Sequence, residues 1–385
     1  MLQEMREKQS GSMFGMFDAD SENPNYLSQQ LITYIGNKRA LIPSINRLLG
    51  EIRLRLGVDK LKTGDLFSGS GAVSRLLKQH SSLVVANDLE SYSCIISDCF
   101  LSNKEDVPVA EVAAIVDRLN RRADAGDYES GFIRELYAPV DEQNITTEDR
   151  VFYTINNAMR LDSFAQWIHE EDAAIRPFLL APLMSRASVH TNTAGVFKGF
   201  YKNTETKKGE FGGRGRNALT RILGQIRMEV PVFSNFNSDK IVLQGDAASV
   251  AKQLPELDLV YLDPPYNQHP YGANYFMLDY LHRYIKPKDI SKVSGIPTDW
   301  NRSSFNVRSK ALASLSATVE SINARFLLIS FNDEGFVSPQ DMRDLLTSMG
   351  DLSELAVEYN TYRGSRNLRD RNIKVVEHLF LLERI

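Results

Sequence analysis

Residues 64–73 read Gly-Asp-Leu-Phe-Ser-Gly-Ser-Gly-Ala-Val, and this stretch decides the predicted fold. Gly69 and Gly71 allow a tight turn between a strand and a helix, because glycine adopts backbone conformations that other residues avoid. A helix is expected directly after the turn, and the apolar strand that follows it ends at Asp88. We therefore expect a strand–turn–helix–strand unit that binds a nucleoside at the carboxyl ends of its strands.

Two features of the sequence restrict the class of ligand that this unit is expected to bind. Asp88 lies 17 residues after Gly71, where an acid at the end of the second strand accepts hydrogen bonds from ribose hydroxyls. No lysine follows the glycines at the Walker spacing, so a triphosphate is not expected. A glycine-rich turn alone also occurs for packing reasons. Together the features favour an adenosine compound without a phosphate chain.

Two further predicted strands lead into acids. Asp246 follows one apolar run, and the tetrapeptide Asp-Pro-Pro-Tyr at 263–266 follows another. A plain strand–turn boundary explains either acid taken alone. The carboxyl ends of parallel strands share one edge of a doubly wound sheet, however, and ligands bind at that edge. We therefore expect the carboxylates of Asp88, Asp246 and Asp263 to converge on one site.

The tetrapeptide offers a specific set of groups to a ligand. Pro264 and Pro265 cannot continue a β-ladder, and they hold the backbone in an exposed bend. This bend presents the Asp263 carboxylate, the Pro264 carbonyl and the aromatic ring of Tyr266. A flat heterocycle with an amino group fits such a site, because the oxygens accept from the amine and the ring stacks.

These residues resemble those of the Dam-like alpha-group DNA adenine-N6 methyltransferases, which use S-adenosylmethionine. The order of glycine turn, long insert and tetrapeptide is typical of that group, and the resemblance runs from about residue 27 to the C-terminus. Residues 34–39 are similar to the segment that closes over the methionine end of the cofactor. The resemblance implies an α/β fold: a Rossmann-like class I methyltransferase sheet with an inserted, mostly helical and loop target-recognition domain.

The resemblance also implies roles for individual cofactor-binding residues. Asp88 would bind the ribose diol, and Asp246 would accept from the amine of the cofactor's adenine. Lys38 would meet the methionine carboxylate, although a surface lysine at the start of an amphipathic helix also explains it. The predicted cofactor-binding residues are Tyr34, Lys38, Asp65, Phe67, Gly69, Gly71, Asp88, Asp246 and Asp263.

The implied reaction explains the tetrapeptide, whose Asp263, Pro264, Pro265 and Tyr266 are the predicted catalytic residues. The exocyclic nitrogen of adenine is a poor nucleophile, and acceptors on both of its N–H groups favour a tetrahedral nitrogen with a localised lone pair. Tyr266 would stack on the base, which must be flipped out of the duplex. Asp263 favours adenine over cytosine. An RNA adenine methylase and a non-catalytic DNA-binding regulator are the alternatives.

Double-stranded DNA is the expected partner, although the net charge is −4. Residues 186–216 include seven basic and only two acidic residues, with glycines and aromatic residues among them. A basic loop of this kind suits phosphate contact. The predicted DNA-binding residues are Lys198, Lys202, Arg214, Arg216, Tyr271, Asn274 and Tyr275, with Asn192, Asn203 and Asn217 as further candidates. A second basic run spans residues 363–374.

The chain is expected to divide into a catalytic domain and an insert. Residues 26–100 and 236–385 form the predicted S-adenosylmethionine-binding domain, residues 101–235 the target-recognition insert, and residues 1–25 a flexible N-terminus. The stretch between Asp88 and Asp246 holds about 130 residues more than a strand–helix connection needs. Segments 354–362 and 375–382 are predicted to be the antiparallel pair that ends a methyltransferase sheet.

The remaining composition favours a cytoplasmic, nucleoid-associated enzyme. At 385 residues and 43% hydrophobic content the chain can form a large core, and it has no apolar run of membrane-spanning length. Cys94 and Cys99 are expected to be packed thiols, and the six histidines lack the spacing of metal ligands. No metal is predicted, and a cognate restriction endonuclease is a possible partner.

Overall fold

The computed structural model describes residues 22–216, 218–333, 335–360 and 374–384, and its strands form one seven-stranded sheet in that part of the chain. The strands are β1 (Leu61–Asp65), β2 (Ser81–Asp88), β3 (Asp239–Gln244), β4 (Leu257–Leu262), β5 (Ala324–Asn332), β6 (Asp351–Asn360) and β7 (Lys374–Glu383). Their order is β3-β2-β1-β4-β5-β7-β6. All pairs from β3 to β5 are parallel, and β7 is antiparallel to both of its neighbours.

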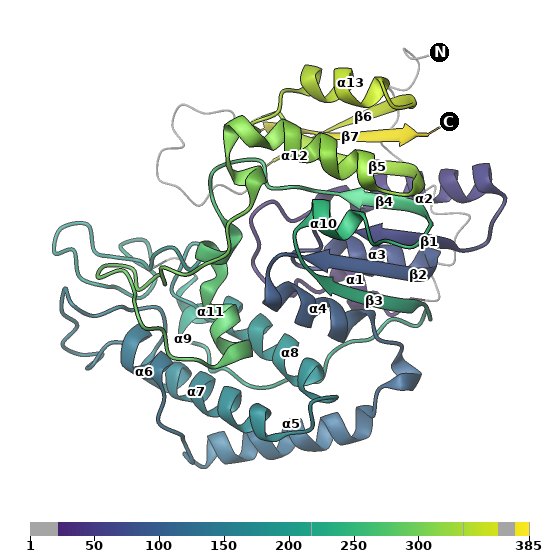
Figure 1. The fold of residues 1–385 in the computed structure, drawn as a ribbon. Coiled ribbons are helices and arrows are strands. Elements are labelled where there is room, and N and C mark those ends of the chain that lie inside the picture. The colour runs from purple at the N-terminus through teal and green to yellow at the C-terminus, as the bar shows by residue number, and fades with distance from the viewer. Residues whose placement is uncertain (1–21, 217, 334, 361–373, 385) are drawn as a thin grey trace.

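Helices cover both faces of this sheet (Figure 1). The helices of the sheet region are α1 (Pro24–Ser28), η3 (Arg39–Leu41), α2 (Ile42–Leu56), α3 (Ala72–His80), α4 (Ser91–Leu101), α10 (Ala247–Ala251), α11 (Tyr271–Arg283), η5 (Ser304–Asn306), α12 (Arg308–Ser321) and α13 (Pro339–Thr347). α2 and α3 pack on one face, whereas α10, α12 and α13 pack on the other. The result is a three-layer α/β structure.

The alternation of side chains along the strands builds the two cores. Leu259 and Tyr261 of β4 pack against α2 and α3, while Val260 and Leu262 pack against the opposite layer. The same alternation divides β5 and β7 between the two cores. Because both of their faces are covered, the inner strands β4 and β5 are largely apolar, as expected of parallel strands that are buried on both sides.

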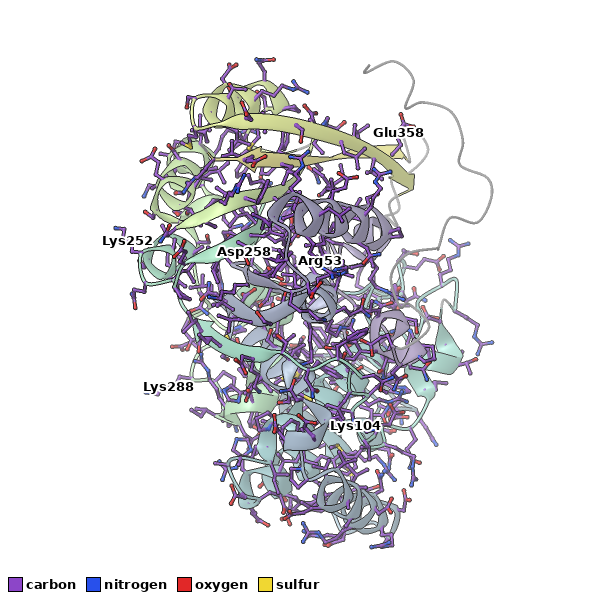
Figure 2. All side chains as sticks on the ribbon, turned by 90° about the vertical axis from the view of Figure 1, so that its right-hand side faces the viewer. Arg53, Lys104, Lys252, Asp258, Lys288 and Glu358 are labelled. Carbon is purple, nitrogen blue, oxygen red and sulfur yellow. The ribbon has the colours of Figure 1, made fainter. Side chains whose placement is uncertain are left out.

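The insert is helical and shares a core with the sheet region. Its helices are η4 (Lys104–Asp106), α5 (Val109–Asp124), α6 (Phe132–Tyr137), α7 (Ile155–Glu170), α8 (Arg176–Val189) and α9 (Leu219–Leu223). α8 packs against α4 and α11, and one hydrophobic cluster includes side chains from all three. Figure 2 shows the sheet, with Glu358 of β6, above this helical region and Lys104.

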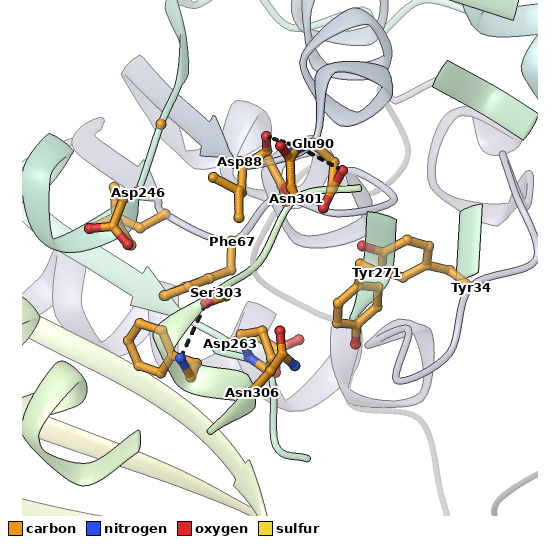
Figure 3. A pocket seen from close by; sticks show the side chains of 16 residues that line it. Tyr34, Phe67, Asp88, Glu90, Asp246, Asp263, Tyr271, Asn301, Ser303 and Asn306 are labelled. Carbon is orange, nitrogen blue, oxygen red and sulfur yellow. Dashed lines mark hydrogen bonds between the residues drawn. The ribbon is translucent and has the colours of Figure 1, made fainter. Parts of the chain in front are cut away.

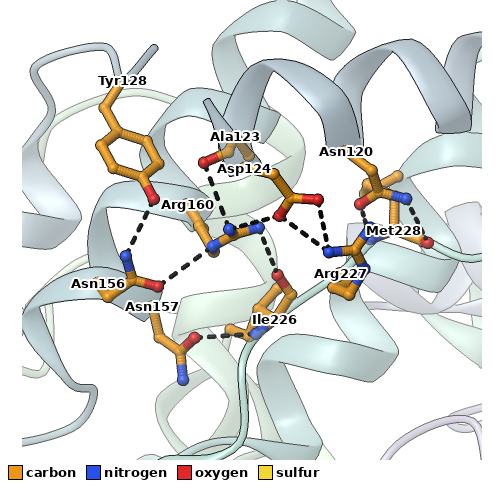
Figure 4. Close-up of polar contacts among 10 residues, drawn as sticks. All are labelled: Asn120, Ala123, Asp124, Tyr128, Asn156, Asn157, Arg160, Ile226, Arg227 and Met228. Carbon is orange, nitrogen blue, oxygen red and sulfur yellow. Dashed lines mark hydrogen bonds and ion pairs between the residues drawn. The ribbon is translucent and has the colours of Figure 1, made fainter. Parts of the chain in front are cut away.

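A polar network fixes the extended chain that returns from the insert to β3. Arg160 of α7 is 1% exposed and donates to the carbonyls of Ile226 and Ala123 and to the carboxylate of Asp124 (Figure 4). The Asn157 amide oxygen accepts from the Ile226 N–H, and Asn120 exchanges two hydrogen bonds with the Met228 backbone. These side chains replace the strand partners that this segment lacks.

The structure confirms the expected fold class and much of its detail. β6 and β7 are the predicted antiparallel pair, and Cys94 and Cys99 are free thiols. The division into domains stays a prediction. Residues 1–21, Asn217 and most of the 363–374 basic run lie outside the described residues. In the part that is described, no helix combines the length and apolarity that crossing a membrane requires.

Replacing Arg160 with Met should destabilise the fold by about 2–4 kcal/mol, because two buried carbonyls would lose their charged donor. Arg227→Ala removes another ion-pair partner of the same Asp124, but the Arg227 side chain is 47% exposed. That control should cost at most about 1 kcal/mol. Urea unfolding of both variants checks the prediction. Equal losses of unfolding free energy in the two variants would show that burial does not determine how much Arg160 contributes to stability.

Candidate active site

The glycine turn after β1 closely approaches the loop of residues 34–38. Gly69 and Gly71 have φ angles of 50° and 73°, in the left-handed region that favours glycine. A Cβ atom at Gly69 would lie 2.8 Å from the Tyr34 ring. The Gly69 N–H donates to Asp88 Oδ2 at 2.7 Å, which ties the turn to the end of β2. The turn therefore leaves no room for a side chain at position 69.

A pocket opens at the point where the strand order reverses, beyond the carboxyl ends of β1, β2 and β4. Ligands of open α/β sheets bind at such a switch point. Figure 3 shows carboxylates from several strand ends around it, together with the rings of Phe67, Tyr34 and Tyr271. Its lining includes Tyr34, Leu66, Phe67, Asp88, Glu90, Asp246, Asp263, Pro265, Tyr271, Asn301, Ser303, Phe305 and Asn306.

A second, smaller lobe adjoins this pocket and shares Tyr34, Phe67 and Asp263 with it. It is lined mainly by the loop before α2 and by the glycine turn. The lining residues are Tyr34, Gly36, Asn37, Lys38, Asp65, Phe67, Ser68, Gly69, Ser70, Ala72, Val73, Tyr261 and Asp263. Asp263 therefore lies where the two lobes meet.

Asp263 belongs to a cluster of charged and hydroxyl groups. The Lys38 ammonium lies 3.1 Å from Asp263 Oδ1 and 2.8 Å from Glu377 Oε1. The Tyr266 hydroxyl is within hydrogen-bond distance of both of these oxygens, at 2.6 Å from Glu377. Ser330 donates to the same Glu377 oxygen at 2.7 Å. Loop 34–38, the end of β4, β5 and β7 thus meet in one network.

Burial and charge set the protonation of the network. Burial and the Glu377 charge raise the pKa of Asp263 to about 6, although Lys38 opposes the shift. Burial would also raise the pKa of Glu377, but Lys38 and the hydroxyl donors outweigh it and lower that pKa. The pKa of Lys38 is raised, because the two carboxylates outweigh the effect of its burial. At neutral pH the cluster contains two carboxylates and one ammonium.

Three other acids that line the two lobes, Asp65, Asp88 and Glu90, are buried. Burial raises the pKa of Asp65 to about 7, against the hydrogen bond that the Ser74 hydroxyl donates. Burial and the charges of Asp279 and Asp88 raise the pKa of Glu90 to about 8. Glu90 accepts from the Asn301 amide at 3.1 Å. A largely protonated Glu90 can both donate to and accept from a bound hydroxyl.

Three stacked tyrosines hold the 34–38 loop against α11. The Tyr34 ring is stacked on Tyr271 and Tyr275, at centroid distances of 5.0 and 4.7 Å. The Ile35 N–H donates to the Tyr275 hydroxyl at 2.7 Å, and the Tyr271 hydroxyl donates to the Ile35 carbonyl at 3.3 Å. The loop that carries Lys38 is therefore fixed to the helix that follows the tetrapeptide.

A model of the D12 class N6 adenine-specific DNA methyltransferases matches residues 34–345, which include this pocket, the glycine turn and the tetrapeptide. The chain belongs to this family. Its reaction is therefore methyl transfer to adenine N6 in DNA, and methyltransferases of this kind in general take the methyl group from S-adenosylmethionine.

Three relatives match most of the methyltransferase. Type II methyltransferase M.NlaIII of Neisseria lactamica is 26% identical over 92% of this chain and 99% of its own length. Type II methyltransferase M.CviAII of Paramecium bursaria Chlorella virus 1 is 27% identical over 91% of this chain and 98% of its own. Modification methylase StsI of Streptococcus sanguinis is 24% identical over 91% of this chain, which spans about half of StsI.

The structure brings most of the expected cofactor-binding residues of the methyltransferase to the two lobes. Gly71 is the exception, since it lies at the N-cap position before α3 and lines neither lobe. Lys38 lies in the second lobe but is paired with Asp263 and Glu377. The Asp246 carboxylate caps α10 by accepting from the Ser249 N–H, and it remains exposed to the main pocket. Among the described residues, no cluster of three potential metal ligands occurs.

The expected DNA-binding residues of the methyltransferase divide into two groups. Arg214 and Arg216 are exposed, as is Lys198, while Lys202 is half-buried with its ammonium over the Phe200 ring. Tyr271 reaches the pocket, but Asn274 and Tyr275 are 4% and 0% exposed.

Of the further candidates, Asn192 is fully buried. Its amide donates to the Val151 and Glu210 carbonyls, and its oxygen accepts from the Gly212 N–H. The Asn203 oxygen accepts from the backbone N–H groups of Glu205 and Thr206. These contacts give both side chains a role in the shape of the loop.

Several residues of the site were missed by sequence reasoning. Asn301, Ser303 and Asn306 reach the pocket from the long connection after α11, where no motif marks them. Glu377 had a signal in the sequence, because Leu379 and Leu381, which share its face of the strand, are apolar. A buried carboxylate is costly unless it is paired, so an isolated acid in a core strand indicates a partner.

Gly69→Ala should abolish tight binding of S-adenosylmethionine, because the new methyl group would push Tyr34 into the pocket. Gly57→Ala is the matched control, since Gly57 has a φ of 66° and open space around its Cβ position. Both variants should lose about 1 kcal/mol of stability from backbone strain. Calorimetric titration with S-adenosylmethionine should show weakened binding in the Gly69 variant alone. Similar affinities in both would contradict the close approach.

Proposed function

We propose that this methyltransferase acts on an adenine flipped out of double-stranded DNA, with Asp263 and the Pro264 carbonyl as acceptors for the N6 amine. The observation that carries the proposal is the position of Asp263. It follows β4 directly and lies where the two lobes of the pocket meet. An amine bound there is adjacent to any ligand that fills both lobes, which supports direct transfer between them.

We assign the main pocket to the nucleoside part of S-adenosylmethionine and the second lobe to its methionine part. The donors and acceptors fit this ligand. Asp88 and Glu90 can bind ribose hydroxyls, the exposed Asp246 carboxylate can accept from the adenine amine, and Phe67 offers an apolar wall. The glycine turn, which a single Cβ would fill, allows close approach in the second lobe. The ligand supplies an electrophilic methyl group.

The protein groups around Asp263 would act on the nucleophile. The amine nitrogen becomes more basic as its N–H groups bind to oxygen acceptors, and this effect is larger in the transition state than in the ground state. The proton released by the product can go to Asp263 or to water. Tyr266 now contacts Lys38 and Phe331, with 4.7 and 4.6 Å to its ring centroid. Stacking of the Tyr266 ring on the base stays a prediction.

We further propose that the enzyme is the modification partner of a restriction system. The support is the names of the relatives, two of which are type II methyltransferases of nearly the same length and another a modification methylase. A cognate restriction endonuclease would then recognise the same sequence. Such an enzyme would work in the cytoplasm, in association with the nucleoid.

The basic loop of the insert is our proposed contact with the DNA backbone. Arg214 and Arg216 are exposed at a turn where Gly212 and Gly213 have positive φ angles. Lys198 is exposed and lies 3.5 Å from His269, which follows the tetrapeptide. The loop therefore continues from the catalytic end of the sheet, as a surface that positions a duplex over the pocket must.

Asp263→Asn should reduce methyl transfer at least about 100-fold, because the amide group also presents N–H donors to the amine. The measurement is transfer of labelled methyl from S-adenosylmethionine to unmethylated genomic DNA and to total RNA. N6-methyladenine should appear in DNA with the wild type and with Asp344→Asn, an exposed acid of α13. Label confined to RNA, or full activity without Asp263, would refute the proposal.

Arg214→Ala combined with Arg216→Ala should weaken DNA binding and reduce the slope of log affinity against log salt by about 2, one for each lost phosphate contact. The control combines Lys104→Ala with Lys252→Ala, two exposed lysines labelled in Figure 2. Fluorescence anisotropy over a salt series gives both slopes. An unchanged slope in the arginine variant would exclude the loop from the interface.

A further inference from the structure

The position of Glu377 in β7 makes it an unusual residue. It is 0% exposed and lies in a strand that pairs on both sides, opposite Asn332 of β5 and Val357 of β6. By the alternation of the strand it shares a face with Leu379 and Leu381, which pack against α2 and α3. A carboxylate in such a core strand is costly unless its charge is compensated.

Its compensation comes from the groups that also bind the catalytic acid. One oxygen of Glu377 and one oxygen of Asp263 both contact the Lys38 ammonium, and both contact the Tyr266 hydroxyl. The four groups thus form a closed ring in which cationic or hydroxyl donors alternate with carboxylates. Ser330 adds a further donor on the Glu377 side.

The ring divides a limited number of protons between two acceptors. A phenol has one proton, so the Tyr266 hydroxyl can donate to only one carboxylate at a time. Lys38 likewise divides its positive charge between Asp263 and Glu377. Without Glu377, both donors would turn to Asp263. The Asp263 carboxylate would then bind Lys38 and Tyr266 instead of an incoming amine. With its charge compensated by these two donors, Asp263 would also be a weaker hydrogen-bond acceptor.

We propose that Glu377 is a positioning residue for methyl transfer, which shares Lys38 and Tyr266 with one oxygen of Asp263 and so leaves the second oxygen of Asp263 available to the adenine amine. The inference rests on the proposed role of Asp263 in the reaction. Glu377 follows the stretch matched by the family model, which ends at residue 345, and it lines neither lobe of the pocket. It therefore acts through its neighbours and touches no substrate.

The decisive variant is Glu377→Gln, which keeps the size and the acceptor oxygen but removes the charge. The structure predicts a kcat lowered about tenfold or more and a KM for S-adenosylmethionine within about twofold of the wild type, because no binding group is lost. Glu383→Gln, at the half-buried far end of the same strand where Glu383 pairs with Arg55 and Arg325, is the matched control and should retain the wild-type kcat.

A pH profile separates positioning from a merely structural role. The negative charge of Glu377 raises the pKa of Asp263. Its removal should therefore move the acidic limb of kcat/KM, near pH 6 in the wild type, to lower pH. The charged and titratable groups that surround Asp263 are Lys38, Asp65, Tyr261, Tyr266, Tyr271 and Glu377, and only the last is altered. A lower kcat with an unmoved limb would overturn the proposal.

A double-mutant cycle tests the coupling without turnover. Glu377→Gln, Asp263→Asn and the double variant should show Tm losses that are not additive, because the two acids share Lys38 and Tyr266. Ser330→Ala provides a milder perturbation if Glu377→Gln folds poorly. It removes one donor to Glu377, keeps every charge, and should lower kcat less than Glu377→Gln.

The outcomes distinguish this inference from the proposed function. A wild type that binds S-adenosylmethionine and shows the coupling, but methylates no adenine, would refute the proposed function. An active wild type whose Glu377→Gln variant has normal kcat, or additive Tm losses with Asp263→Asn, would refute the role of Glu377.

Discussion

Lys38 places one positive charge between the buried carboxylates of Asp263 and Glu377, and the pocket end of the sheet is arranged around that charge. Either acid alone in this environment would be driven toward its protonated form. Sharing the ammonium keeps both ionised near neutral pH, at a net charge of minus one. It also joins β4, β7 and the loop before α2, three segments that are distant in the sequence.

The aromatic stack extends this constraint to the insert. Tyr271 and Tyr275 connect the Lys38 loop to α11, and α11 lies in the same hydrophobic cluster as α8 and the other insert helices. A displacement of the insert relative to the sheet would therefore disturb the loop that carries the ammonium. Interiors packed at this density transmit such displacements with little loss.

The sequence predicted the elements whose chemistry is local. The glycine turn, the strand-end acids and the tetrapeptide can each be recognised from a stretch of about ten residues. The parallel topology then brings the carboxyl ends of these strands together. The family assignment also decides between the alternatives, in favour of DNA adenine methylation over RNA methylation or a regulator without catalysis.

The rest depends on pairings across the fold that no local pattern specifies. Lys38 was expected to be available to the cofactor, yet its partners are 225 and 339 residues away. Asn274 and Tyr275 were expected at the DNA, and their burial results from packing of α11 against the insert. Asn192 shapes the loop by internal hydrogen bonds. Its residue type alone could not distinguish it from an asparagine that faces solvent and contacts DNA.

The insertion of β7 between β5 and β6 has a consequence for synthesis on the ribosome. A nascent chain that stopped before residue 374 would contain the glycine turn, the tetrapeptide and β6, but β6 would have no strand to pair with in the sheet. It would also leave Lys38 without its second carboxylate. A chain cut before β7 would therefore expose unpaired strand edges at β5 and β6, of the kind that favour aggregation and proteolysis.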